Sequence, residues 1–175
     1  MTHATGWREI LITGRVRQSG LSNLMITTFT LMVGLFLSAF TSATLLPGTS
    51  EAALAALVAS GDHAVWGLVA VATAGNVLGS TVNWALGLYV DRFKNRRWFP
   101  VSPDALDRAS RWFGKYGIWS LLLAWLPVIG DPLTLLAGVM RVRFVPFLIL
   151  VTIGKAARYA MIAGGASVLM TLLGP

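Results

Sequence analysis

Four charged side chains lie within sequence that is otherwise apolar: Glu51, Asp131, Lys155 and Arg158. A charge at the centre of a membrane helix costs at least about 2.5–3.5 kcal/mol, so these side chains need partners or a watery cavity. We expect Lys155 and Arg158 to be the partners of the two carboxylates. A carboxyl group that titrates near physiological pH suits proton coupling, so these four residues and the polar Asn76 form a candidate pathway for a substrate or for protons.

A structural alternative is open for the same charges. Ion pairs between Glu51 and Lys155, or between Asp131 and Arg158, would then fix how neighbouring segments dock and have no role in transport. Asn76 has a parallel alternative, because amides in membrane helices often only hydrogen-bond between helices.

The composition indicates a membrane protein. Of 175 residues, 55% are hydrophobic and only 12% are charged, whereas soluble domains carry roughly a quarter charged residues. The length suits one membrane domain, since each span takes about 20 residues. The chain has no cysteine, which excludes disulfides and thiolate metal sites, and its two histidines leave almost nothing for a histidine metal cluster or a Ser-His-Asp triad. We therefore expect no metal and no cofactor.

Basic residues indicate the topology. The net charge is +7. In so hydrophobic a chain, basic residues usually mark loops kept on the cytoplasmic side of a bacterial inner membrane, so we expect no binding to nucleic acid. The segment 1–20 is a basic N-terminal segment, and the loop 91–117 is predicted to be cytoplasmic. Within it, Ser102 and Pro103 indicate a helix start, and Trp112 and Phe113 contribute to an apolar side for lying on the membrane surface.

Two segments are predicted to span the membrane directly, residues 63–90 and 144–173. The first carries no charge between Asp62 and Asp91. It also places Gly75 and Gly79 four residues apart, which favours the close approach of a neighbouring helix.

Two other segments, 38–60 and 118–140, are predicted to be hairpins, because each is broken in its middle. Both contain Leu-Pro followed by a carboxylate four residues past the proline, and the prolines are 80 positions apart. Hairpins that enter from opposite faces would bring the two carboxylates together near the bilayer midplane. The expected turn residues are Pro47, Gly48, Pro127, Gly130 and Pro132. The fold class is therefore an all-α membrane protein of polytopic helices with two opposed re-entrant hairpins related as an inverted repeat.

Arg141 and Arg143 follow the second hairpin directly. They are candidates for contact with phosphate headgroups, and the alternative is that they only determine topology.

Four motifs carry a family resemblance: SATLLPGTSE, GNVLGSTVNWALG, WLPVIGDPLTLLAGVMRVRFVPF and the late Gly154. Over roughly residues 35–165 they resemble the DedA superfamily, specifically its short YqaA-like branch. The resemblance implies two opposed re-entrant hairpins and a link to lipid movement, including undecaprenyl phosphate recycling and phospholipid scrambling. Typical members carry two arginines around the second hairpin, at positions occupied here by Ala124 and Gly130.

Taken together, these features predict a single membrane domain, residues 1–175, that transports or scrambles a lipid or another amphiphile. Its partners would be membrane lipids, with a homo-oligomer left open. A non-transporting membrane factor for envelope assembly is the main alternative. We expect no enzymatic activity, because no second intramembrane aspartate completes a protease dyad with Asp131.

Overall fold

The computed structural model describes residues 24–43, 48–89, 103–126 and 129–173, and the regular structure within these ranges is entirely helical. Three helices in the described ranges are long and apolar enough to cross a membrane: Leu24–Ser42, α3 (Val65–Leu88) and α7 (Phe144–Leu173). The expectation of an all-helical membrane protein is confirmed at this level. The spans predicted at 63–90 and 144–173 fall on α3 and α7.

Of the two segments predicted to be hairpins, 38–60 begins with the end of the long helix Leu24–Ser42 and then contains one short helix, whereas 118–140 contains two short helices. The helix Leu24–Ser42 is followed by α2 (Thr49–Ala59), and the 3₁₀ helix η1 (Gly117–Trp125) is followed by α6 (Gly130–Val139). Each segment therefore breaks where the sequence indicated a break. The turn prolines Pro47 and Pro127 lie outside the described residues, as does the basic segment 1–20.

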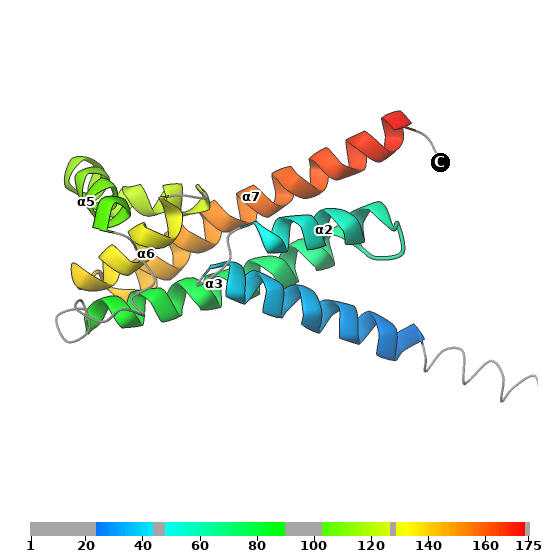
Figure 1. Ribbon diagram of the computed structural model, residues 1–175, viewed down its shortest axis with the longest axis horizontal. Helices are drawn as coiled ribbons and strands as arrows, with labels where there is room; N and C mark the ends of the chain where they lie inside the picture. Colours follow the sequence, from blue (N-terminus) through cyan, green and yellow to red (C-terminus); the bar gives the residue numbers. More distant parts are fainter. Residues whose placement is uncertain (1–23, 44–47, 90–102, 127–128, 174–175) are drawn as a thin grey trace, which may run out of the picture. The chain divides into compact units, whose positions relative to one another are not determined.

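The chain forms two compact units, residues 1–34 and 35–175, and every site described below belongs to the second. In that unit α3 lies along both α6 and α7, while α7 also packs against η1 and α2 (Figure 1). The centre of this unit is apolar, with Leu121, Leu133 and Phe147 fully buried.

Glycines let the backbones in this unit approach closely. A Cβ at Gly79 would stand 2.7 Å from the Phe40 carbonyl oxygen, so the helix that ends at Ser42 can pack here only against glycine. Gly87 of α3 and Gly138 of α6 face each other, and a Cβ on either would collide with the backbone of the other helix. The small residues predicted to favour close packing on α3 do so.

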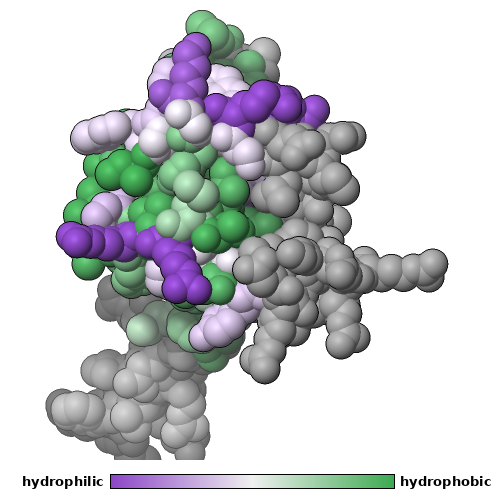
Figure 2. All heavy atoms as spheres, turned by 90° about the vertical axis from the view of Figure 1, so that its left-hand side faces the viewer, coloured by the Kyte–Doolittle hydropathy of each residue, from purple (hydrophilic) through white to green (hydrophobic). Residues whose placement is uncertain are grey.

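The basic helix α5 (Pro103–Tyr116) begins at the proline expected to start it. Its apolar side faces the protein, however: Phe113 is buried in the core and Trp112 packs against that core. The expectation that Phe113 lies on the membrane surface is therefore wrong, because α6 and η1 pack against this side of α5, whereas Trp112 is only partly buried. Seen from the end where α5 lies, hydrophobic side chains form a patch flanked by hydrophilic ones (Figure 2).

Candidate functional site

The two carboxylates occupy equivalent places in their helices. Glu51 lies in the first turn of α2 and Asp131 in the first turn of α6. A negative charge at this end of a helix is stabilised by the free N–H groups and by the helix dipole. Because each of these helices begins after a break, its N-terminus and its carboxylate lie beside α7.

Asp131 is bound by the most deeply buried charge. Lys155 of α7, only 3% exposed, approaches the Asp131 carboxylate with 3.3 Å between Nζ and Oδ1. The same ammonium donates a hydrogen bond to Oδ1 of Asn76 on α3. The Lys155 ammonium of α7 therefore donates to one charged acceptor on α6 and one neutral acceptor on α3.

Glu51 is bound by Arg158, whose Nη2 donates to the carboxylate Oε1. Both side chains are partly open, Arg158 at 18% and Glu51 at 29% exposed. The four charges thus form two ion pairs, as expected in general, but with the partners exchanged. The pairings Glu51–Lys155 and Asp131–Arg158 are wrong, because α6 docks level with Lys155 and α2 docks level with Arg158.

Two hydroxyl groups extend this cluster, and the sequence analysis did not identify either. The Tyr159 hydroxyl lies 2.8 Å from Ser50 Oγ and accepts a hydrogen bond of 3.0 Å from Asn76 Nδ2. Tyr159 is 2% exposed and Ser50 is fully buried. A signal was available, since Tyr159 follows Lys155 by four residues and so shares its helix face.

A continuous polar chain follows from these contacts. It runs from Asp131 through Lys155, Asn76 and Tyr159 to Ser50, and so joins α6 to α2 through the two long helices. We call these five residues, with Glu51 and Arg158, the polar cluster.

The polar cluster lies at mid-length of the helices that could span the membrane. Asn76 is the twelfth of the 24 residues of α3, while Lys155 and Arg158 are the twelfth and fifteenth of the 30 residues of α7. At 1.5 Å per residue α3 is about 36 Å long, slightly more than the hydrocarbon core. The middle of such a helix falls near the middle of the bilayer.

The described turn residues have different surroundings. Gly48 adopts a left-handed conformation, with φ of 99°, directly before α2. Gly130 lies against the Ala124 carbonyl, where a Cβ would collide. Pro132 is buried in the first turn of α6, where a missing N–H costs nothing.

The two basic residues Arg141 and Arg143 are exposed, between α6 and α7. Arg141 has φ of 53° and closes α6 with two backbone hydrogen bonds of 2.9 Å, from its own N–H to Gly138 and from the Val142 N–H to Ala137. This is a Schellman ending, whose left-handed position usually holds glycine. Arg143 stands at the start of α7, before Phe144.

The polar cluster presents charged and hydrogen-bonding groups that could bind a polar ligand. Among the described residues, no group of three histidine, aspartate or glutamate side chains could hold a metal ion. What the polar cluster offers is two cations, two carboxylates and neutral donors within an apolar helical unit.

Comparisons with known proteins identify the family. The VTT domain model matches residues 46–167. Inner membrane protein YqaA of Escherichia coli is 44% identical over 132 residues, which cover 75% of this chain and 88% of that protein. An uncharacterized protein of Haemophilus influenzae is 36% identical over 132 residues, 71% of this chain and 80% of its own length.

A more distant relative has a name that states a substrate. Undecaprenyl phosphate transporter A of Staphylococcus aureus is 34% identical over 67 residues, which cover 38% of this chain and 32% of that protein. No solved structure matches the chain. The VTT domain model matches most of the chain, and both this match and the similarity to YqaA agree with the motifs noted above. The chain therefore belongs to the VTT domain family, within the DedA superfamily.

Proposed function

We propose that this chain is a multi-pass protein of the inner membrane that moves a lipid or lipid-linked amphiphile across the bilayer, with the polar cluster as the path for its headgroup. The observation that carries the proposal is the presence of two ion pairs at mid-length of α7. Ionisable residues at this depth are rare and usually mark a substrate or ion pathway. The partial relative named as an undecaprenyl phosphate transporter supports the same class of substrate.

In this proposal α2 and α6 are the inner limbs of two re-entrant hairpins that enter from opposite faces. Both helices begin after a break, and both carry a carboxylate in the first turn. Many transporters build their sites from such broken helices, related as an inverted repeat. The basic loop 91–117 is then cytoplasmic, although residues 91–102 lie outside the described part of the chain.

Proton coupling is the second part of the proposal. Lys155 and Arg158 are each held by a carboxylate, so neither is free for an anionic headgroup. Protonation of Asp131 or Glu51 would weaken that hold and release a cation for the substrate. The exposed fractions of the two carboxylates, 27% and 29%, support their access to a proton or a headgroup.

The test is lipid translocation in proteoliposomes, measured with a headgroup-labelled fluorescent lipid and a membrane-impermeant quencher. Glu51→Gln and Asp131→Asn should each slow translocation. Asp62→Asn is the matched control, because Asp62 is an exposed carboxylate outside the helices. If both neutral variants translocate lipid at the wild-type rate, and cells that carry them grow normally under alkaline or antibiotic stress, the proposal fails.

One observation favours the alternative of a non-transporting factor in envelope assembly. Arg111, Trp112, Lys115 and Tyr116 line a small hollow on α5, and Lys115 Nζ lies 5.1 Å above the Tyr116 ring. Basic and aromatic side chains together suit the headgroup region of a membrane. In that case Arg108→Gln with Arg111→Gln should impair growth under envelope stress, and the two carboxylate variants should not.

A further inference from the structure

The two short helices that carry the carboxylates are packed very differently. In α6, eight of the ten residues are buried, and Gly138 lies so close to Gly87 of α3 that neither has room for a Cβ. In α2, three of the eleven residues are buried: Ser50, Leu54 and Val58. These three follow one another at intervals of four residues, so they form one narrow stripe on the helix. The unit therefore encloses α6, whereas it holds α2 along one side.

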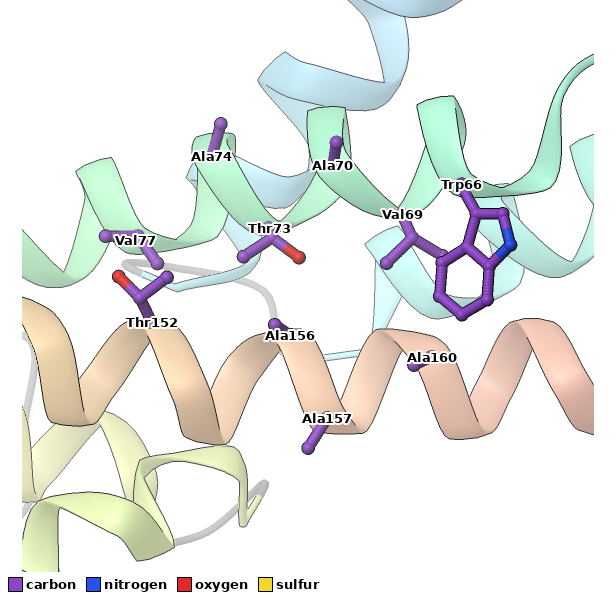
Figure 3. Close-up of a pocket in the computed structure, with 10 residues that line it drawn as sticks. All are labelled: Trp66, Val69, Ala70, Thr73, Ala74, Val77, Thr152, Ala156, Ala157 and Ala160. Atoms are coloured by element: carbon purple, nitrogen blue, oxygen red, sulfur yellow. The ribbon is translucent and has the colours of Figure 1, made fainter.

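The part of the unit beside α2 is also loosely packed. Helix α2 lies beside the first half of α3 (Figure 1), and along that half an open groove of about 660 Å³ separates α3 from α7. Figure 3 shows Val69 and Thr73 pointing from α3 across this groove, with Ala156 on the facing side of α7. Near the other end of α3, Trp84 stacks on Phe147 of α7 with the ring centroids 5.8 Å apart. Movement costs least where packing is loose, which is the half that contains α2.

Both ends of α2 have a glycine in the left-handed region. Gly48 directly precedes the helix with φ of 99°, and Gly61 comes two residues after its last residue with φ of 74°. A Cβ at either position would meet no described atom within 4 Å. Glycine changes between regions of φ at little cost, and hinges are formed by a few such positions at the ends of an element. The two glycines therefore allow α2 to turn as a rigid body between them.

Two side-chain contacts join the first turn of α2 to α7. Glu51 pairs with Arg158, and Ser50 Oγ lies 2.8 Å from the Tyr159 hydroxyl. Because the Tyr159 oxygen accepts a hydrogen bond from Asn76, its single proton is directed to Ser50. Tyr159 and Ser50 are both buried. The docked position of α2 thus supplies the acceptor for a buried phenol proton, and any movement of α2 away from α7 must break this bond.

We infer that α2 is a gate beside the polar cluster, hinged at Gly48 and Gly61, and that Tyr159 is the positioning residue that holds this gate closed. When α2 turns away from α7, Glu51 leaves Arg158 and the guanidinium becomes available to an anionic group, while α6 stays in place. The inference rests on the proposed function for what passes the gate, and it deepens that function by naming which of the two helices opens. The position of α2 can be measured whether or not a lipid moves.

The test compares the rates at which N-ethylmaleimide labels a buried cysteine on each short helix, in the full chain in liposomes. The chain has no native cysteine, so Leu54→Cys reports on α2 and Leu133→Cys reports on α6. Both leucines are fully buried, which makes the two reporters a matched pair. A buried thiol reacts only when its surroundings open, so the rate follows the population of the open form. We expect Leu54→Cys to react faster than Leu133→Cys.

Variants of the first-turn contact should act on one reporter alone. Tyr159→Phe and Ser50→Ala each remove the bond between α2 and α7, and each should raise the labelling rate at Leu54→Cys about fivefold, the effect of one lost hydrogen bond. Labelling at Leu133→Cys should stay unchanged. The two substitutions together should add little at Leu54→Cys, because they remove the same bond. Tyr89→Phe is the matched control, since the Tyr89 side chain is exposed at the end of α3.

The outcomes separate a positioning role from a general structural one. Equal acceleration at both reporters would mean that the variants loosen the whole unit, and it would overturn the inference. An unchanged rate at Leu54→Cys in Ser50→Ala would overturn it as well, because this variant keeps the bond between Asn76 and Tyr159 and so removes only the link to α2.

The labelling test and the translocation assay can also fail independently. Slow lipid translocation in Glu51→Gln, together with an unchanged rate at Leu54→Cys in Ser50→Ala, would support the proposed function and refute the gate. Selective acceleration at Leu54→Cys in a chain that moves no lipid would uphold the gate and refute only the proposed function.

Discussion

Removal of the Asp131 charge should destabilise the protein more than removal of the Glu51 charge. Breaking a buried ion pair by deleting one partner costs about 3–5 kcal/mol, because the other charge stays buried. In Asp131→Asn the Lys155 ammonium would stay buried without its ion-pair partner, since its side chain is only 4% exposed. Asn76 still accepts a hydrogen bond from Lys155, so we expect the lower end of the range, about 3 kcal/mol.

The corresponding loss for Glu51→Gln should be smaller, because both members of that pair are partly exposed and the protein encloses the remaining Arg158 less completely than it encloses Lys155. Arg158 is 18% exposed and Glu51 is 29% exposed. The matched reference is the double variant Asp131→Asn with Lys155→Met. It leaves no buried charge at this place, so its stability should return to within about 1 kcal/mol of the wild type.

The assay is equilibrium unfolding in mixed micelles, followed by the fluorescence of the seven tryptophans. A double-mutant cycle over Asp131 and Lys155 then isolates the coupling of the pair, which we expect to be at least about 2 kcal/mol and larger by whatever Lys155→Met alone costs. A loss below about 0.5 kcal/mol for Asp131→Asn alone, or equal losses at Asp131 and Glu51, would refute the reasoning that burial of Lys155 determines the effect.

Three further predictions concern packing, the α6 ending and the hydroxyl network. Gly138→Ala should destabilise by about 1–3 kcal/mol in the same assay, because its Cβ would meet the Trp84 carbonyl; Gly164→Ala, in open space on α7, should be neutral or stabilising, and equal effects would contradict the close packing. Arg141→Gly should stabilise by about 1 kcal/mol, because glycine adopts the left-handed conformation without strain, and should weaken binding to anionic liposomes in a flotation assay if the side chain contacts headgroups; unchanged binding would leave it a topology determinant. Tyr159→Phe should cost about 1–2 kcal/mol by unfolding, since it removes the common partner of Ser50 and Asn76; a smaller loss in a Ser50→Ala background would show that the two hydroxyls act together.

The sequence was sufficient to locate α3, α7 and the charges, because hydropathy depends only on composition along the chain, but it did not predict Leu24–Ser42 as a third helix long enough to span. The charge-free stretch between Asp62 and Asp91 indicated α3, and each Leu-Pro motif came just before the start of a short helix, α2 or α6. It could not decide which cation meets which carboxylate. Lys155 and Arg158 are three residues apart, about 4.5 Å along the helix axis. The axial level at which α6 docks depends on close packing at Gly130 and Gly138.

The same limit explains the two features that were missed. Tyr159 and Ser50 are unremarkable in an apolar helix until the rotation of α7 relative to α3 is known. The apolar side of α5 was assigned to the membrane because an amphipathic pattern specifies that one face is buried but not by what. Phe113 instead lies in the protein core, and Trp112 packs against that core.

The exposure of the charges bears on the two interpretations of the polar cluster. Ion pairs that only fix the docking of helices are best sealed, since any contact with water weakens the attraction. Lys155 fits that description, but its partner Asp131 keeps 27% of its side chain exposed, and neither member of the Glu51–Arg158 pair is closed off. One buried cation beside three partly exposed charged side chains is an arrangement that favours a binding site over ion pairs that only fix helix docking. Glu51 is the more exposed of the two carboxylates and its cation is the less buried, so we expect its neutralisation to affect lipid movement more than stability.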